Sequence, residues 1–343
     1  MRIDFHFYAI YALARAVGFS PDNAHVIAYA SQYTDDEVKE NTIYFENGGE
    51  FEPFITAHRI FDPHTVSEEI CKKVWIPFHF LPGNLGVGNE KLLTKANCVI
   101  VQEMIKQFLS YNKLDYSRHL LGIILHAYAD TWSHQNFMGI MDGMNRVTKL
   151  KVNGQNVSIY KIAPPLGHAQ TGSTPDEPRL ELEYIDYLEE LHHVANYNRA
   201  LEAAQNCYNI LSDFMTKFSD EFRDSRLIPW QQIEGKVKSL FRNQTDLGGC
   251  ITAWGEAISN DGLGFISQGK DKNLIYDAGE WFNIAIKTEL RMNQESGQFV
   301  EYYIKNDNYE ISDLKYFNDA AAFYWSTLFI KNAEKLGLDI LLS

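Results

Sequence analysis

The stretch LGIILHAYADTWSHQNF, residues 121–137, decides what kind of protein this sequence encodes. His126, Asp130 and His134 follow one another at intervals of four within an apolar run. Residues four apart lie on one face of a helix, so the three side chains would project toward a common point. A buried aspartate is costly unless it is hydrogen-bonded or paired with a cation. A metal ion bound on a buried helix would supply that cation.

The strength of the metal-binding signal depends on how many histidines share this spacing. One histidine on an apolar face is usually a hydrogen-bonded core residue, and an HxxxD pair alone is common. The second histidine, four residues after Asp130, makes the pattern suited to ligation of zinc or a similar ion by imidazole and carboxylate groups.

Further candidate ligands lie in other segments of the chain. Five of the 11 histidines occur in short stretches rich in aromatic, Gly or Pro residues, namely His6, His79, His126, His134 and His168, and SQYTDD adds a carboxylate pair. These candidates are too many for one ion, so the sequence predicts a site of two or three ions in which a carboxylate such as Asp130 bridges. The candidate metal ligands are His6, Asp35, Asp36, His58, His79, His126, Asp130, His134, His168 and Asp176.

Composition and charge exclude several classes of protein. The 343 residues are 45% hydrophobic, which is enough for a large core. The formal charge of −14 disfavours nucleic acids and anionic membrane surfaces as partners. No uncharged window approaches the roughly 18 residues of a membrane span, and Asp4, His6 and Arg15 interrupt the apolar run at the amino terminus. We therefore expect a soluble, cytoplasmic protein.

The apolar pattern predicts a mainly α fold. Helices are expected over residues 7–17 and from Pro21, after the N-cap Ser20, and helical periodicity also covers 90–112 and 116–137. Asn153-Gly154 indicates one small β-hairpin. Most of the sequence after residue 179 is typical of helices. We expect a metal-binding helical core at 1–185 and a C-terminal helical region at 186–343, either within the same domain or appended to it.

Several segments together resemble a known superfamily. DFHFYAIYALARAVGF, IAYASQYTDD, WIPFHFLPG, HAYADTWSHQNF and GHAQTGSTPD carry the candidate ligands in an order that resembles the zinc-dependent phospholipase C and single-strand-specific zinc nuclease superfamily. The closest resemblance is to an uncharacterised prokaryotic family with the HAYADTWSHQNF-type motif. The resemblance covers about residues 1–185.

The resemblance implies a multi-helix bundle around a trinuclear zinc cluster that hydrolyses phosphodiester bonds. In secreted relatives the main-chain amine of an amino-terminal Trp binds the third ion, whereas Met1 and Arg2 precede the motif here. Carried over by position, the first ion would take Asp36, an upstream histidine, His126 and Asp130, the second His134, His168 and Asp176, and the third His6 with the bridging Asp130.

Two ligand assignments stay open at this point. The upstream histidine is either His58 or His79, with His64 as a third candidate. Asp176 lies farther from His168 than the superfamily pattern expects, so it is alternatively a helix N-cap or a turn residue before Pro178.

The predicted function is that of a metal-dependent hydrolase. Two or three Zn²⁺ ions, with Mn²⁺ or Fe²⁺ as alternatives, would activate a water for attack on a phosphodiester or related phosphate ester. Asp36 would orient or deprotonate that water, and Asp130 would bridge the ions. A small-molecule or lipid phosphate ester is the expected substrate. The alternatives are an HD-type nucleotide phosphohydrolase, whose adjacent His-Asp pair is missing here, and a noncatalytic metal-stabilised binding protein.

Overall fold

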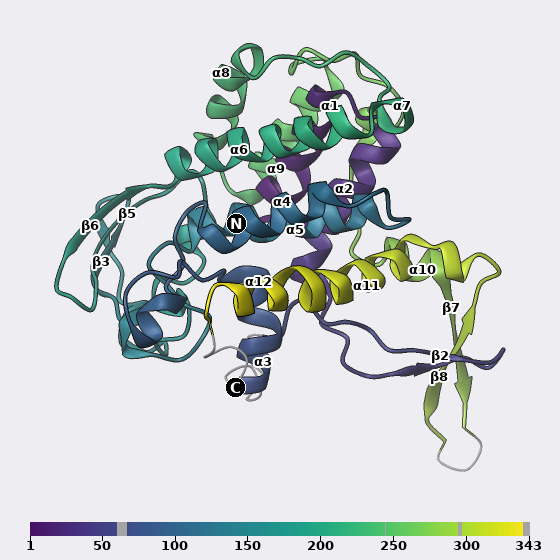
Figure 1. Cartoon of the computed structure of the whole chain (residues 1–343), viewed down its shortest axis with the longest axis horizontal. Coiled ribbons are helices and arrows are strands. Elements are labelled where there is room, and N and C mark those ends of the chain that lie inside the picture. Colours follow the sequence, from purple (N-terminus) through teal and green to yellow (C-terminus); the bar gives the residue numbers. More distant parts are fainter. Residues whose placement is uncertain (60–66, 244, 294–296, 339–343) are drawn as a thin grey trace.

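The helices of the protein pack around α5 (Ser117–Ser133) (Figure 1). The computed structural model describes residues 1–59, 67–243, 245–293 and 297–338. Within them α2 (Pro21–Asp36), α6 (Asn196–Lys217) and α11 (Asp313–Phe323) each contact α5. Nearly every residue of α5 is buried. Residues 121–133 of the stretch LGIILHAYADTWSHQNF thus lie in the central helix.

The first two predicted helices are confirmed. A π-helical segment, η1 (Asp4–Ala9), continues into α1 (Ile10–Val17). Gly18 ends α1 with a φ of 109°, a left-handed conformation that glycine adopts at low cost. The Ser20 hydroxyl caps α2 by accepting a hydrogen bond from a backbone N–H at 3.2 Å.

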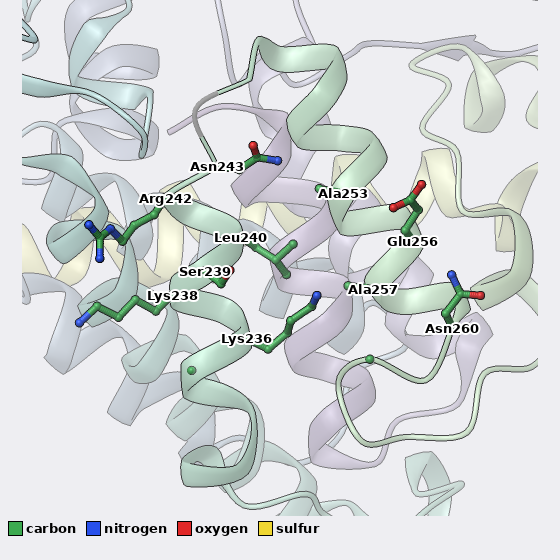
Figure 2. Close-up of a pocket in the computed structure, with 12 residues that line it drawn as sticks. Lys236, Lys238, Ser239, Leu240, Arg242, Asn243, Ala253, Glu256, Ala257 and Asn260 are labelled. Atoms are coloured by element: carbon green, nitrogen blue, oxygen red, sulfur yellow. The ribbon is translucent and has the colours of Figure 1, made fainter.

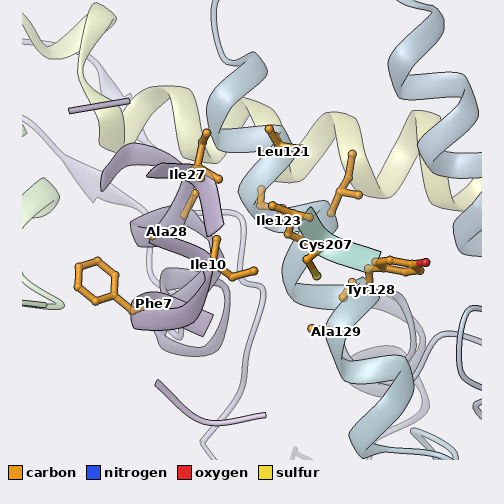
Figure 3. Packing of buried hydrophobic residues seen from close by; sticks show 14 of the residues in the cluster. Phe7, Ile10, Ile27, Ala28, Leu121, Ile123, Tyr128, Ala129 and Cys207 are labelled. Carbon is orange, nitrogen blue, oxygen red and sulfur yellow. The ribbon is translucent and has the colours of Figure 1, made fainter. Parts of the chain in front are cut away.

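A glycine lets α2 and α5 approach each other closely. A Cβ atom on Gly122 would lie 2.4 Å from the carbonyl oxygen of Ile27 and 2.6 Å from the Cβ of Ala30. Figure 3 shows the buried apolar residues around this contact, with Ile27 and Ala28 on α2 and Leu121 on α5. The backbone of α2 therefore occupies the space beside Gly122, and this contact sets the distance between two helices that carry candidate ligands.

The other helices complete the bundle. They include α3 (Glu68–Ile70), which runs into the π-helical η3 (Cys71–His79), and α4 (Val99–Ser110). After α6 come α7 (Ser219–Phe222), α8 (Trp230–Phe241), α9 (Leu247–Ser259), α10 (Glu280–Ala285) and, beyond α11, η11 (Tyr324–Phe329) and α12 (Ile330–Lys335).

The prediction of a mainly α fold with one hairpin is wrong. The described residues form three small antiparallel sheets, so the fold is mixed α and β, although helices dominate it. One sheet pairs β1 (Ile43–Tyr44) with β2 (Glu50–Phe51). Another pairs β7 (Ile286–Met292) with β8 (Phe299–Lys305), a hairpin that projects from the bundle in Figure 1.

The largest sheet contains the predicted hairpin and two strands that were not predicted. Its order is β4-β3-β5-β6. The hairpin at Asn153-Gly154 joins β3 (Thr148–Val152) to β4 (Gln155–Asn156). β5 (Glu181–Ile185) and β6 (Leu191–Ala195) extend it. In β5, Leu182 and Tyr184 are buried and alternate with more exposed residues, as expected for a strand with one covered face.

A single apolar cluster runs through most of the chain. Its buried side chains extend from Met1 to Leu338, so residues before and after 185 share one core. A smaller cluster under the four-stranded sheet includes Phe80, Phe137 and Tyr184. Among the described residues, no helix is both long and apolar enough to cross a membrane.

Candidate metal centre

The carboxyl-terminal end of α5 presents the first three ligand candidates. His126 and Asp130 lie on its last turns, and His134 follows the helix as its C-cap residue. The exposed fractions of these residues are 0%, 1% and 4%. Their spacing places them on one face, as predicted, and the surrounding helices bury that face.

Two amino-terminal elements bring a histidine and a carboxylate to this face. The π-helical turn of η1 carries His6, whose ring stacks on that of His126 with centroids 4.0 Å apart. The last turn of α2 carries Asp35, whose Oδ1 lies 3.7 Å from Nε2 of His126. The close α2–α5 contact at Gly122 makes this approach possible.

The remaining candidates come from η3 and from the loop before β5. His79 is the last residue of η3. A hydrogen bond from the Tyr324 hydroxyl to the carbonyl of Pro77, at 2.7 Å, anchors the turn that carries it. His168 and Asp176 flank the short 3₁₀ turns of the loop, and the side chain of Asn196 donates hydrogen bonds to its backbone.

Four ligand atoms surround one point near His126. Nε2 of His126 lies 3.2 Å from Nδ1 of His79 and 3.4 Å from Oδ2 of Asp130. Nδ1 of His79 lies 3.5 Å from the same carboxylate oxygen and 3.7 Å from Oδ1 of Asp35. Tetrahedral zinc ligands, at about 2.0–2.2 Å from the ion, are about 3.3–3.6 Å apart. The distances between the two histidines, and from each histidine to the two carboxylates, are therefore close to the spacing that a zinc ion requires.

A second group forms where α5 ends. Nε2 of His134 lies 3.0 Å from Oδ1 of Asp176, and Nε2 of His168 lies 3.3 Å from Oδ2 of the same residue. The two imidazole rings lie side by side, with centroids 4.7 Å apart. Asp130 Oδ2 lies 3.8 Å from Nδ1 of His134. The second group therefore adjoins the first across a shared carboxylate.

A third group lies on the other oxygen of Asp130. Nε2 of His6 lies 3.1 Å from Oδ1 of Asp130. The main-chain amine of Met1 donates a hydrogen bond to the same oxygen, and it lies 3.2 Å from Oδ1 of Asp176. Burial lowers the pKa of this amine, but the carboxylates of Asp130 and Asp176 outweigh burial and raise it to about 11. The amine thus supplies a positive charge between two carboxylates.

Backbone carbonyls determine which ring nitrogens carry hydrogen. A carbonyl only accepts, so Nδ1 of His134 donates to the carbonyl of His79 at 2.6 Å, and Nδ1 of His168 donates to that of Gly172 at 2.8 Å. In a neutral ring with this hydrogen position Nε2 is bare, and in both residues Nε2 faces a carboxylate oxygen of Asp176. Two acceptors at this distance repel each other unless a cation lies between them.

The same arrangement holds at His79. Its Nε2 donates to the carbonyl of Thr56 at 2.8 Å, which leaves Nδ1 bare toward His126 and Asp130. In metal-binding histidines, the ring nitrogen that does not face the ion typically donates such a hydrogen bond, which fixes the tautomer and the ring orientation. The chemistry and geometry of the donor set fit a metal cluster.

Electrostatics also favour a cation over protonated histidines. Burial lowers the pKa of His126 well below its ordinary value and also lowers that of His168. Burial and the neighbouring Asp130 raise the pKa of Asp35 well above its usual range. Neutral imidazoles beside crowded carboxylates are the state in which metal ions bind.

Two predicted ligands lie outside the cluster, and one candidate cannot be placed. The Asp36 carboxylate accepts hydrogen bonds from the hydroxyl of Tyr276 at 2.6 Å and from Gln32 at 3.2 Å. His58 instead pairs with Glu40 at 2.7 Å. Neighbouring residues on a helix point about 100° apart, so only Asp35 can face α5. His64 lies outside the described residues.

The sequence analysis missed one member of the cluster and the cavity beside it. No side-chain pattern signals the Met1 amine, because its nitrogen belongs to the backbone. An open cavity of about 650 Å³ adjoins the cluster, and Met1 and Asp35 line it together with Gln32 and Tyr276. Asp36 also lines this cavity, so it lies next to the centre without joining it.

A wider groove lies away from the metal centre. Figure 2 shows it between α8 and α9, with a volume of about 870 Å³ and a lining that includes Lys236, Glu256 and Asn260. The groups of described residues that could hold a metal lie elsewhere. Cavity size alone therefore does not locate the candidate centre.

Comparisons with known proteins place the chain in a family. No curated protein and no solved structure matches it. A family model described as "Family of unknown function (DUF6765)" matches residues 1–331, which is nearly the whole length of the sequence. The chain therefore belongs to this family.

Proposed function

We propose that the protein is a metal-dependent hydrolase that acts on a phosphodiester or a related phosphate ester with two or three zinc ions. The observation that carries this proposal is the pair of Nε2 atoms, of His134 and His168, that face the carboxylate of Asp176 at 3.0 and 3.3 Å while Nδ1 of each ring faces a backbone carbonyl. A cation between these atoms removes their repulsion, and zinc suits a histidine-rich set of ligands.

The geometry suggests which residues would hold each ion. Asp130 would bridge, because its two oxygens face different groups of histidines. The first ion would take Asp35, His79, His126 and Asp130, the second His134, His168 and Asp176, and the third His6 and Asp130 beside the Met1 amine. The proposal therefore replaces Asp36 with Asp35 and selects His79 as the upstream histidine.

Ions bound in such a cluster lower the pKa of a bound water and neutralise the oxygens of a phosphoryl group. The chain contributes the ligands, their orientation through backbone carbonyls, and a cavity in which an ester could reach the centre. Asp36 lies on the wall of that cavity and could orient a water or a substrate group there.

The resemblance to the zinc-dependent phospholipase C and zinc nuclease superfamily supports the same function. The order of the candidate ligands along the chain resembles that of the superfamily, and most of these side chains converge. Manganese or iron would be the alternative ions, because both also accept imidazole and carboxylate ligands.

The cavity beside the centre favours a small substrate over a nucleic acid. Asp35, Asp36 and Asp277 line it together with two cationic groups, the Met1 amine and Arg2, and Arg2 is paired with Glu177 at 2.8 Å. A polyanion would meet net negative charge at this entrance. A small-molecule or lipid phosphate ester is therefore the proposed substrate class.

A panel of esters tests the proposal. It would contain bis-p-nitrophenyl phosphate, a short-chain phosphatidylcholine, single-stranded DNA and nucleotides, each offered to the zinc-loaded chain. We expect turnover of a small diester, lost in Asp35→Asn and retained at 10% or more in the matched Asp36→Asn variant. Zinc binding without turnover of any ester would instead favour a role of the ions in stabilising the bundle.

A further inference from the structure

Met1 and Arg2 contact two consecutive residues of the loop before β5, Asp176 and Glu177. The Met1 amine lies 3.2 Å from Asp176, and the guanidinium of Arg2 lies 2.8 Å from Oε2 of the next residue, Glu177. Two consecutive residues thus face two others about 175 positions away in the sequence. The first pair lies within the candidate metal centre, and the second lies just outside it.

The Arg2–Glu177 ion pair is part of a partly buried network of charged side chains. The exposed fractions of the two side chains are 15% and 13%. Arg179 donates to the same Glu177 oxygen at 2.9 Å, and Arg2 also lies 3.3 Å from Asp4. Arg2 thus links Glu177 in the loop to Asp4 at the start of η1. Charge pairs of this kind are costly to break, because one partner is left buried alone.

These pairs join two ligand-bearing segments. Asp4 is the first residue of η1, which carries His6, and Glu177 follows Asp176 directly. Neither Arg2 nor Glu177 belongs to a group of residues that could hold a metal. Their effect on the centre must therefore come through the positions of His6 and Asp176.

We propose that Arg2 and Glu177 are positioning residues that set the distance between Asp176 and the ligands on η1 and α5. This inference rests on the proposed metal centre and goes beyond it, because it assigns a function to residues that bind no ion. The guanidinium of Arg2 contacts Glu177 and Asp4 through two different nitrogens. A lysine at this position would keep the positive charge but would not hold both carboxylates in the same geometry.

Metal affinity, measured by competition with a chromophoric chelator, tests the inference. We expect Arg2→Lys and Glu177→Gln each to weaken binding of one zinc ion by about 10- to 100-fold, while saturating zinc still fills every site. The double variant should lose little more than either single variant, because both changes break the same pair. The d–d absorption of the Co²⁺-loaded chain should shift in the same variants.

A surface pair provides the control. Arg291 binds Glu46 with two nitrogens, at 2.8 and 2.7 Å, far from the centre in the sequence and without a metal group. Arg291→Lys should leave zinc affinity unchanged. Wild-type affinity in both Arg2→Lys and Glu177→Gln would overturn the inference while leaving the metal centre intact. A wild-type chain that binds no zinc would overturn the proposed function and the inference together.

Discussion

Two clusters of histidine and aspartate in this protein differ in a way that separates a candidate metal site from a turn. Near the end of α5, candidate ligand atoms converge in the interior, and backbone carbonyls orient the rings of His79, His134 and His168. On the β5–β6 hairpin, Asp186, Glu190 and His192 also lie within reach of one another.

The hairpin cluster is explained without an ion. Oδ1 of Asp186 accepts hydrogen bonds from the backbone N–H groups of Leu188 and Glu190, at 2.9 and 3.0 Å. Its other oxygen pairs with His192 at 2.8 Å. Asp186 is thus a turn residue with satisfied oxygens, and Glu190 is exposed. Proximity of ligand atoms is therefore not sufficient, because the atoms must also lack other partners and be shielded from water.

The largest expected effect comes from the bridging carboxylate. Asp130→Asn should remove at least one zinc ion and lower phosphodiester turnover by about 1000-fold or more, equivalent to about 4 kcal/mol in the barrier. Asp186→Asn, the matched change in the hairpin, should alter neither value. Zinc analysis and turnover of both variants check the contrast, and equal losses in the two would remove it.

Acid should destabilise the metal-free protein through its buried histidines. Burial, followed by the charge of the Met1 amine, lowers the pKa of His6 to about 4, against about 6.5 in an unfolded chain. The unfolded state therefore binds more protons between these values, and stability falls as pH decreases from about 6.5 to 4.

The size of this loss is on the order of 3 kcal/mol for His6. Urea unfolding of the metal-free chain across this pH range measures it. His6→Gln should flatten the dependence, whereas His193→Gln, on the exposed hairpin strand, should not. An unchanged slope in His6→Gln would contradict the account.

A smaller effect is expected where α2 meets α5. Gly122→Ala should destabilise the fold by about 2 kcal/mol, because the added methyl would overlap the backbone of α2 at Ile27. It should also weaken zinc binding, since Asp35 lies on α2. Gly235→Ala in α8, where no atom lies within 4 Å of the added Cβ, should stabilise by up to about 1 kcal/mol. Thermal unfolding and zinc titration compare the two, and stabilisation by both changes would show that the α2–α5 contact is not tight.

The helices were predictable because their signals are local. Ser20, Pro21 and Gly18 mark the ends of helices by their own hydrogen bonds and dihedral angles. The high apolar content of residues 116–137 reflects the burial of α5 on all sides. The strands β5 and β6 were missed because Leu and Glu favour helices in isolation. Burial of Leu182 and Tyr184 against Phe137 overrides that preference.

The candidate site was predictable only in part. The spacing on α5 predicted three candidate ligands that point to one place, and the structure brings His6, His79 and His168 close to them but not His58. The choice between Asp35 and Asp36 depends on how α2 is rotated against α5, which the sequence does not reveal. The choice between His58 and His79 depends on the tertiary position of η3.

The proposed metal centre is tested by the metal content of the chain, purified without chelator and measured by inductively coupled plasma mass spectrometry. We expect two or three transition-metal ions per chain, mainly zinc. Fewer than one ion per chain, unchanged after dialysis against zinc, would contradict it.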